Sequence, residues 1–230
     1  MNSVLEFSSV SMEERAPYEN GLRAVSFVLE PGDLLLIRIP EGHSLAPLAD
    51  VASGLVEPDE GVIRFLGKSW AEGYEADRAA ARGRIGRVFE RAGWLSNLDF
   101  DENITLAQRY HTRRDPAEIL AEAQTLAREL GLGDIPAGRP AHRDRAVLLA
   151  AQWVRALIGR PRLLLLERPA RDLPGGAVDP FARVILRRRE QDGLAVVWLT
   201  DSHENLDDSA LRPTRKCAMQ DGTLKDETVS

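Results

Sequence analysis

The chain has 230 residues, of which 43% are hydrophobic and 29% are charged, and its formal net charge is −6. This composition suits an α/β domain, and the sequence holds no apolar run of the length that a membrane span needs. The single cysteine excludes an intramolecular disulfide, and the widely spaced histidines and scattered basic residues indicate neither a metal site nor a nucleic-acid-binding surface.

The first ninety or so residues contain several short apolar runs that are separated by turn residues. Runs of this kind predict β-strands, and the Gly, Pro and Asp residues between them predict the turns. In chain order we expect strands at 4–7, 22–29 and 34–39, a helix at 46–53, and strands at 62–66 and 84–89.

Helical periodicity begins in the middle of the chain, where apolar residues recur at intervals of three and four. The run at 163–166 is apolar throughout, which is typical of a strand buried on both faces of a parallel sheet. We expect helices at 118–130, 146–158 and 181–191, strands at 163–166 and 195–200, and a hairpin at 215–224 that turns at Asp221-Gly222. Strands alternate with helices, so the predicted fold class is α/β.

Residues 32–55 have the layout of a phosphate-binding loop, with an apolar strand, a short loop and a helix. The motif G-x-x-x-x-G-K-[ST] would place its Lys at Leu45 and its hydroxyl at Ala46, and Glu41 adds a negative charge. Either the loop is an altered one that binds nucleotide without Lys, or it is a plain strand-to-helix turn. The equivalent positions are Ile39, Pro40, Glu41, Gly42, His43, Ser44, Leu45, Ala46 and Pro47.

The order and spacing of several segments resemble an ABC-transporter ATP-binding subunit along nearly the whole chain. The segments are Val25-Ser26-Phe27 with Pro31-Gly32-Asp33, residues 53–61 (SGLVEPDEG), residues 85–90 (IGRVFE) and residues 155–166 (RALIGRPRLLLL). This resemblance implies a P-loop NTPase-like ATP-binding-cassette fold, with a mainly parallel core sheet and an antiparallel β edge. It also implies a single domain over residues 1–230, with a helical subdomain at roughly 93–160.

The segment GWLSNL at 93–98, with Glu102-Asn103-Ile104, resembles the ATP-binding subunits of MCE-type lipid transporters. In the ABC family the matching region takes a short helix of the membrane permease. The resemblance therefore implies permease contacts, although ordinary core packing is an equal alternative for the aromatic and leucine side chains. The contact positions would be Glu90, Trp94, Leu95 and Leu98.

The positions that perform catalysis in the family carry other residues here. The family ends the strand at 163–166 with Asp-Glu, for Mg²⁺ and for the attacking water, whereas this chain has Glu167-Arg168. A guanidinium stays protonated and cannot act as a base. The glutamine position is Glu90 and the switch histidine position is Asp201. Glu167 and Arg168 form either a new metal or ion-pair site, or a strand-end pair held by neighbours such as Asp201 or Glu90.

The family's signature Leu-Ser-Gly-Gly falls on Arg143, Asp144, Arg145 and Ala146. Asp144 would repel a partner's phosphate, and side chains at 145 and 146 stand where glycines permit close approach. Asp144 either contacts a partner subunit or occupies a helix N-terminus, where the dipole favours an acid. The Asp of the next motif falls at Pro174.

From these replacements we expect a cassette that does not hydrolyse ATP and serves as a structural or regulatory scaffold on a transmembrane permease. The resemblance implies a second, intact ABC ATPase or another copy as partner, a place on the cytoplasmic face of the inner membrane, and lipid as cargo. No cofactor is expected, and ATP with Mg²⁺ would bind weakly at most. The alternatives are a soluble nucleotide-independent regulator and a weakly active ATP-binding subunit.

Overall fold

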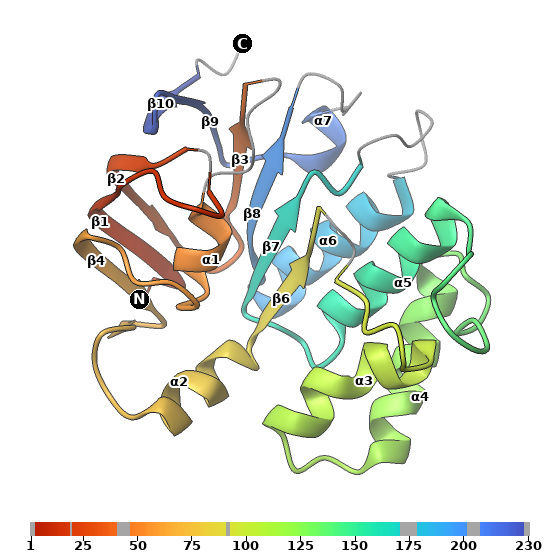
Figure 1. The fold of residues 1–230 in the computed structure, drawn as a ribbon. Coiled ribbons are helices and arrows are strands. Elements are labelled where there is room, and N and C mark those ends of the chain that lie inside the picture. Colours follow the sequence, from red (N-terminus) through yellow and green to blue (C-terminus); the bar gives the residue numbers. More distant parts are fainter. Residues whose placement is uncertain are drawn as a thin grey trace.

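The fold is taken from a computed structural model, which describes residues 3–18, 20–40, 47–90, 93–170, 179–201 and 208–227 (Figure 1). The strands are β1 Leu5–Met12, β2 Leu22–Leu29, β3 Leu34–Arg38, β4 Glu60–Phe65, β5 Lys68–Ser69, β6 Ile85–Val88, β7 Leu163–Glu167, β8 Ala195–Thr200, β9 Arg215–Gln220 and β10 Thr223–Asp226. The helices are α1 Leu48–Ala52, α2 Glu75–Arg82, α3 Phe100–His111, α4 Pro116–Glu129, α5 Arg145–Leu157, α6 Asp179–Asp192 and α7 Asp208–Leu211.

The core sheet has the strand order β10-β9-β3-β8-β7-β6, and only the β9–β10 pairing is antiparallel. Its central strands are apolar because both faces are covered. Along β3, Leu34 and Leu36 pack on the side of α5 and α6, whereas Leu35 and Ile37 pack toward α1 and the second sheet. The mainly parallel α/β sheet that the sequence predicts is thereby confirmed.

The second sheet has the order β2-β1-β4-β5 and is antiparallel throughout. Its inner face packs toward the core sheet, where the rings of Phe7 and Phe27 stack with their centroids 4.5 Å apart. The register of β1 shifts between Phe7 and Val10, and Ser9 has a φ of 50° there. This irregularity explains why the apolar pattern predicts a strand only at 4–7 while the strand continues to Met12.

The helical part of the fold consists of α3, α4 and α5, which lie beside β6 and β7 in Figure 1. The α4 helix begins at Pro116, and the Asp115 side chain caps it by accepting the N–H of Ala117 at 2.7 Å. The α5 helix buries Trp153, whose ring stacks on Phe181 of α6 at 4.8 Å. These contacts fix α5 against the sheet between β6 and α6.

Several predicted elements agree with the structure, and four elements escaped the sequence patterns. Strands β2 and β8 have the predicted bounds, and Cys217 is buried in β9. The missed elements are α2, α3, α7 and the two-residue strand β5. Across the described residues, no helix combines the length and the apolar character that crossing a membrane requires.

Candidate functional site

The strands β6, β7 and β8 have their carboxyl ends at the same edge of the core sheet. These strands are parallel neighbours, with Val88 opposite Leu166 and Glu167 opposite Leu199. The residues that follow the strands therefore meet in space although they are far apart in sequence. The residues brought together in this way are Glu90, Glu167, Arg168 and Asp201, which are the positions that the sequence singles out.

The guanidinium of Arg168 bridges two carboxylates at this edge. Its Nη1 lies 2.7 Å from Oε1 of Glu90, and its Nε lies 2.8 Å from Oδ2 of Asp201. The side chains of Arg168 and Asp201 are only 4% and 2% exposed. We call Arg168, Glu90 and Asp201 the Arg168 cluster. Ion pairs to neighbouring acids thus hold Arg168 at the end of β7, and such pairs are compatible with both interpretations of this position.

The backbone of Arg168 is in the left-handed region, with a φ of 42°. Its N–H nevertheless donates to the carbonyl of Leu199 at 2.8 Å, which ties the residue to β8. A conformation of this kind is uncommon outside glycine and persists where surrounding contacts over-determine it. The two ion pairs of the guanidinium supply contacts of that kind.

Glu167 belongs to a second group of polar side chains beside the sheet edge. We call Glu167, Arg87, Asp50 and Tyr18 the Arg87 cluster. Arg87 pairs with Glu167 through Nε and with Oδ1 of Asp50 through Nη1 at 2.5 Å. The hydroxyl of Tyr18 donates to Oδ2 of Asp50 at 2.6 Å. Burial, with help from this hydrogen bond to Asp50, raises the pKa of Tyr18 to about 12. Burial also raises the pKa of Glu167, although Arg87 and the backbone N–H of Glu90 act in the opposite direction.

The described residues at the sheet edge do not fit hydrolysis of a Mg²⁺-bound nucleotide. The carboxylate of Glu167 is already bound by Arg87, and the next position offers a guanidinium that cannot take a proton from water. In the phosphate-loop region, Ile39 is buried and its N–H donates to Thr200, while Pro47 precedes α1 as its N-cap. Pro40 is exposed. The remaining predicted loop positions lie outside the described residues and are Glu41, Gly42, His43, Ser44, Leu45 and Ala46.

The signature equivalents lie at the start of α5 and are exposed. Asp144 is the N-cap residue, and its carbonyl accepts the N–H of Leu148 at 3.0 Å. Arg143 donates to the carbonyl of Ala137 at 2.6 Å. Asp144 thus occupies a helix N-terminus, as one of the two interpretations holds, whereas its contact with a partner subunit stays a prediction. Pro174 lies outside the described residues.

A groove of about 460 Å³ lies between β6 and α3. Three of its side chains are apolar and exposed, namely Leu95 (47%), Leu106 (43%) and Tyr110 (78%). The described lining holds two arginines and a histidine but no acid. The lining residues are Ile85, Gly86, Arg87, Phe89, Gly93, Leu95, Asn103, Leu106, Ala107, Tyr110, His111 and Arg155.

Of the four predicted permease contacts, only Leu95 lines this groove. Trp94 instead packs on the core, edge-on to Phe100 at 5.4 Å, and Glu90 is bound to Arg168. Leu98 is half-buried outside the lining. Sequence reasoning missed Leu106 and Tyr110, although their spacing of four residues places both on one face of a helix.

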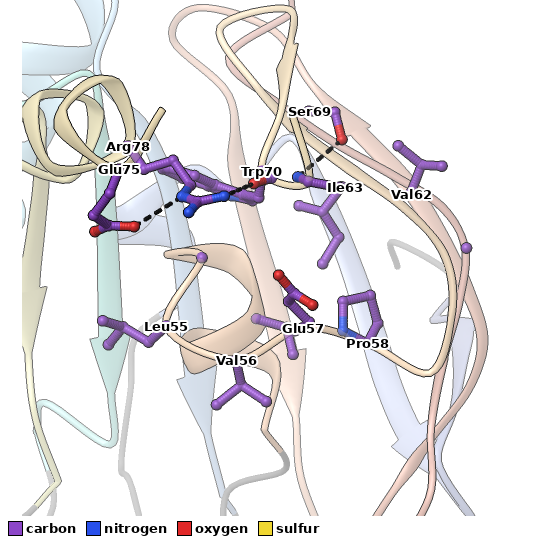
Figure 2. A pocket seen from close by; sticks show the side chains of 14 residues that line it. Leu55, Val56, Glu57, Pro58, Val62, Ile63, Ser69, Trp70, Glu75 and Arg78 are labelled. Carbon is purple, nitrogen blue, oxygen red and sulfur yellow. Dashed lines mark hydrogen bonds and ion pairs between the residues drawn. The ribbon is translucent and has the colours of Figure 1, made fainter. Parts of the chain in front are cut away.

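A second cavity, of about 250 Å³, lies among the end of α1, strand β4 and helix α2 (Figure 2). Dashed lines in the figure mark the interactions of Ser69, Glu75 and Arg78, and the carboxylate of Glu57 also lies in the lining. Arg78 pairs with Glu75 at 2.9 Å and donates to the carbonyl of Trp70 at 3.4 Å.

Comparison with known proteins finds ABC cassettes in sequence and in structure, although no protein-family profile matches. The chain is 26% identical over 210 residues to the macrolide export ATP-binding/permease protein MacB of Syntrophobacter fumaroxidans, covering 90% of this chain and 29% of that protein. It is 28% identical over 206 residues to the lipoprotein-releasing system ATP-binding protein LolD of a Ruegeria species, covering 88% of each.

Two solved structures share the fold. One is the dimeric bacterial ABC transporter cassette MJ0796, with a TM-score of 0.82, 19% identity and coverage of 98% and 99% of the two chains. The other is that cassette bound to ADP and phosphate in a post-hydrolysis state, with a TM-score of 0.81, 18% identity and the same coverage. The sequence relatives are ATP-binding proteins by name. These findings contradict the expectation that the chain takes no cofactor, and that expectation was wrong.

Proposed function

We propose, on the premise that this chain has an ABC nucleotide-binding domain, that it is the ATP-binding subunit of a membrane transporter and does not hydrolyse ATP at its own site. The relatives named above support the first part, because they are ATP-binding components of export and release systems. The Arg168 cluster supports the second part.

The chemistry of Arg168 is the observation that carries the proposal. Hydrolysis needs a group that orients and deprotonates the attacking water. At the end of β7 the side chain is a guanidinium, and Glu90 and Asp201 bind it on two sides. The adjacent carboxylate of Glu167 is held by Arg87 and by the N–H of Glu90. The described residues thus stabilise one another and leave none in the role of base.

We further propose that the groove between β6 and α3 docks a transmembrane permease on the cytoplasmic face of the membrane. Exposed Leu95, Leu106 and Tyr110 give it an apolar rim, and exposed apolar patches of this kind are typical of protein-binding surfaces. The dimeric form of the structural neighbour supports a second cassette as partner, either another copy or an intact ATPase.

We propose lipid as the cargo of the transporter. The relatives are named for macrolide export, lipoprotein release and phosphonate import, so they do not agree on one substrate. The chain also spans only 29% of the MacB protein of Syntrophobacter fumaroxidans. The GWLSNL segment at 93–98 supports lipid transport of the MCE type.

Phosphate release from Mg²⁺-ATP by the purified chain tests the catalytic part of the proposal. Binding of labelled ATP is measured on the same sample, so that absence of turnover is not confused with absence of nucleotide. We expect bound ATP and a rate of phosphate release equal to that of buffer. Sustained release that follows the protein through purification would contradict the proposal.

Capture from native membranes in a gentle detergent tests the docking part. We expect a permease to co-purify with the tagged chain and to be lost in the variant Leu106→Ser. The matched control is Val28→Ser, because Val28 is also an exposed apolar residue (51%) but lies on β2, away from the groove. A bait that brings down no membrane protein would rule out the transporter role.

A further inference from the structure

One wall of the groove is the chain segment that leaves β6, for which the structure describes residues 88–90 and 93–95. We call it the groove wall. The N–H of Phe89 donates to Oε1 of Gln152 at 3.2 Å, and the carbonyl of Gly93 accepts Nη1 of Arg155 at 2.9 Å. Leu95 exchanges two hydrogen bonds with the side chain of Asn103, at 2.9 and 3.1 Å. The wall is therefore tied to α3 and α5 at several points.

The aromatic rings of the wall add contacts with two arginines. The guanidinium carbons of Arg87 and Arg155 lie 4.5 and 5.4 Å from the ring centroid of Phe89, and that of Arg155 lies 4.6 Å from the ring of Trp94. Arg87 also binds Glu167 and Asp50. The floor of the groove is thus continuous with the charged edge of the core sheet.

Glu90 is the point where the wall meets the Arg168 cluster. Its carboxylate binds Arg168, and its N–H donates to the carboxylate of Glu167. Through the same guanidinium, Asp201 joins the segment after β8 to the wall. A single buried side chain therefore connects the ends of three strands.

The three residues of this cluster replace the glutamine, the glutamate and the histidine of the family pattern. Taken one at a time, each replacement removes a side chain that the family pattern has at that position. Taken together, a buried cation lies between two anions, of which Asp201 is buried and Glu90 is 25% exposed, and both anions pair with the same guanidinium. The replacements therefore form one structural unit.

We infer that Arg168 is a positioning residue that holds the groove wall from inside the protein, so that the groove keeps its docking shape with or without nucleotide. The inference rests on the proposed function, because it concerns the groove that we assign to the permease. It adds a statement about how the groove is regulated: the internal Arg168 cluster fixes the shape of the groove wall.

Amide hydrogen exchange of the full chain tests this inference. In the wild type we expect residues 85–98 to exchange at the same rates with and without Mg²⁺-ATP. In the variant Arg168→Gln we expect their exchange to rise at least several-fold. The matched control Arg187→Gln removes an ion pair of equal length, 2.7 Å to Glu129, between α6 and α4, and should leave residues 85–98 unchanged.

A triple variant without the three charges distinguishes a positioning role of Arg168 from a general loss of stability. It also keeps the test valid if Arg168→Gln does not fold. Glu90→Gln/Arg168→Leu/Asp201→Asn removes the cation together with the two acids that it compensates. We expect a higher unfolding midpoint than in Arg168→Gln, with exchange of residues 85–98 still raised. Exchange that returns to the wild-type rate would overturn the inference, as would a wild-type wall whose protection changes with Mg²⁺-ATP.

The two proposals fail in different ways. The exchange experiment reads the isolated chain and needs no permease. If the wild-type chain captures no permease but its exchange behaves as expected, the docking proposal alone is contradicted. Wild-type exchange in Arg168→Gln, with permease capture intact, would contradict the positioning role alone.

Discussion

At the scale of single residues, removing one buried charge of this chain changes the free energy of unfolding more than the intact ion pair contributes to it. A buried ion pair contributes little net stability against an apolar replacement, but removing one partner leaves an uncompensated charge in a low-dielectric site. Arg168 compensates two carboxylates, so its loss is the severe case.

We predict that Arg168→Ala lowers the free energy of unfolding by about 3–5 kcal/mol. The control Arg187→Ala breaks a pair whose arginine side chain is 43% exposed and should cost less than about 1 kcal/mol. Urea unfolding followed by circular dichroism measures both variants. Equal losses in the two variants would contradict the burial argument.

Tyr18 gives a prediction about high pH. The pKa of Tyr18 is raised to about 12 by burial and by its hydrogen bond to Asp50, so the folded state favours the protonated phenol. The resulting stability is present below the unfolded pKa of about 10 and is lost as the pH rises toward 12. The difference in absorbance titration between the wild type and Tyr18→Phe should show one step near pH 12. A step near pH 10 would refute it.

Cys217 gives a prediction about reactivity. Burial, assisted by the hydrogen bond from the thiol to Asp226, raises its pKa to about 11, and only the thiolate is nucleophilic. We expect a disulfide reagent at pH 8 to react slowly with the native chain and rapidly in urea. Fast reaction of the native chain would show that the thiol is accessible.

Residue contacts mark how far the sequence can predict the site. The acids around Arg168 could be proposed in advance, because each follows a predicted strand of one parallel sheet. Asp50 and Tyr18 of the Arg87 cluster could not, because Asp50 lies on α1 and Tyr18 lies on the loop between β1 and β2. No local pattern links these positions, and only the packing of α1 against the core sheet brings them together.

At the scale of elements, predictability follows burial. Strands β7 and β8 are buried throughout, and all their residues except the last, Glu167 and Thr200, are apolar because both faces are covered, so the sequence places both strands. Helix α2 has no buried residue, and its apolar residues are all alanines, so no large apolar side chain marks it in the sequence. Helix α3 opens with a polar turn, yet Asp99 and Glu102 form a capping box whose spacing is visible in the sequence.

The packing of α5 against β6 depends on Gly86. A Cβ at this position would lie 1.9 Å from the carbonyl oxygen of Ala156, and backbone cannot yield as a flexible side chain can. We predict that Gly86→Ala lowers the unfolding free energy by at least about 3 kcal/mol and disturbs the groove. Gly131→Ala, in open space but with a φ of 84°, should cost about 1 kcal/mol. Thermal unfolding of both variants distinguishes clash from strain.

At the scale of the whole molecule, the fold is retained although the residues at the family's catalytic positions are replaced. Alternating strands and helices, together with the framework segments, predict the cassette fold, and the structural comparison confirms it. The same comparison does not show catalytic activity, because two chains of 18–19% identity can share a backbone and differ at every reacting position.

Catalysis at this scale needs several parts at once, because a residue that acts in a unit contributes little alone. We therefore predict no phosphate release from Glu90→Gln/Arg168→Glu/Asp201→His, which restores three family residues but leaves Leu45 and the signature positions unchanged. An assay of phosphate release from Mg²⁺-ATP measures it against the wild type. Turnover in this variant would show that these three positions alone had silenced the site.

The Arg168 cluster has a consequence for energy coupling. A ligand shifts a conformational equilibrium only as far as it binds one state more tightly than the other. A groove wall that internal ion pairs hold in one arrangement presents a single state, so the coupling free energy between ATP and a docked partner would be close to zero. The affinity of this subunit for its partner would then be the same at any ATP concentration, and energy for transport would have to enter through another subunit.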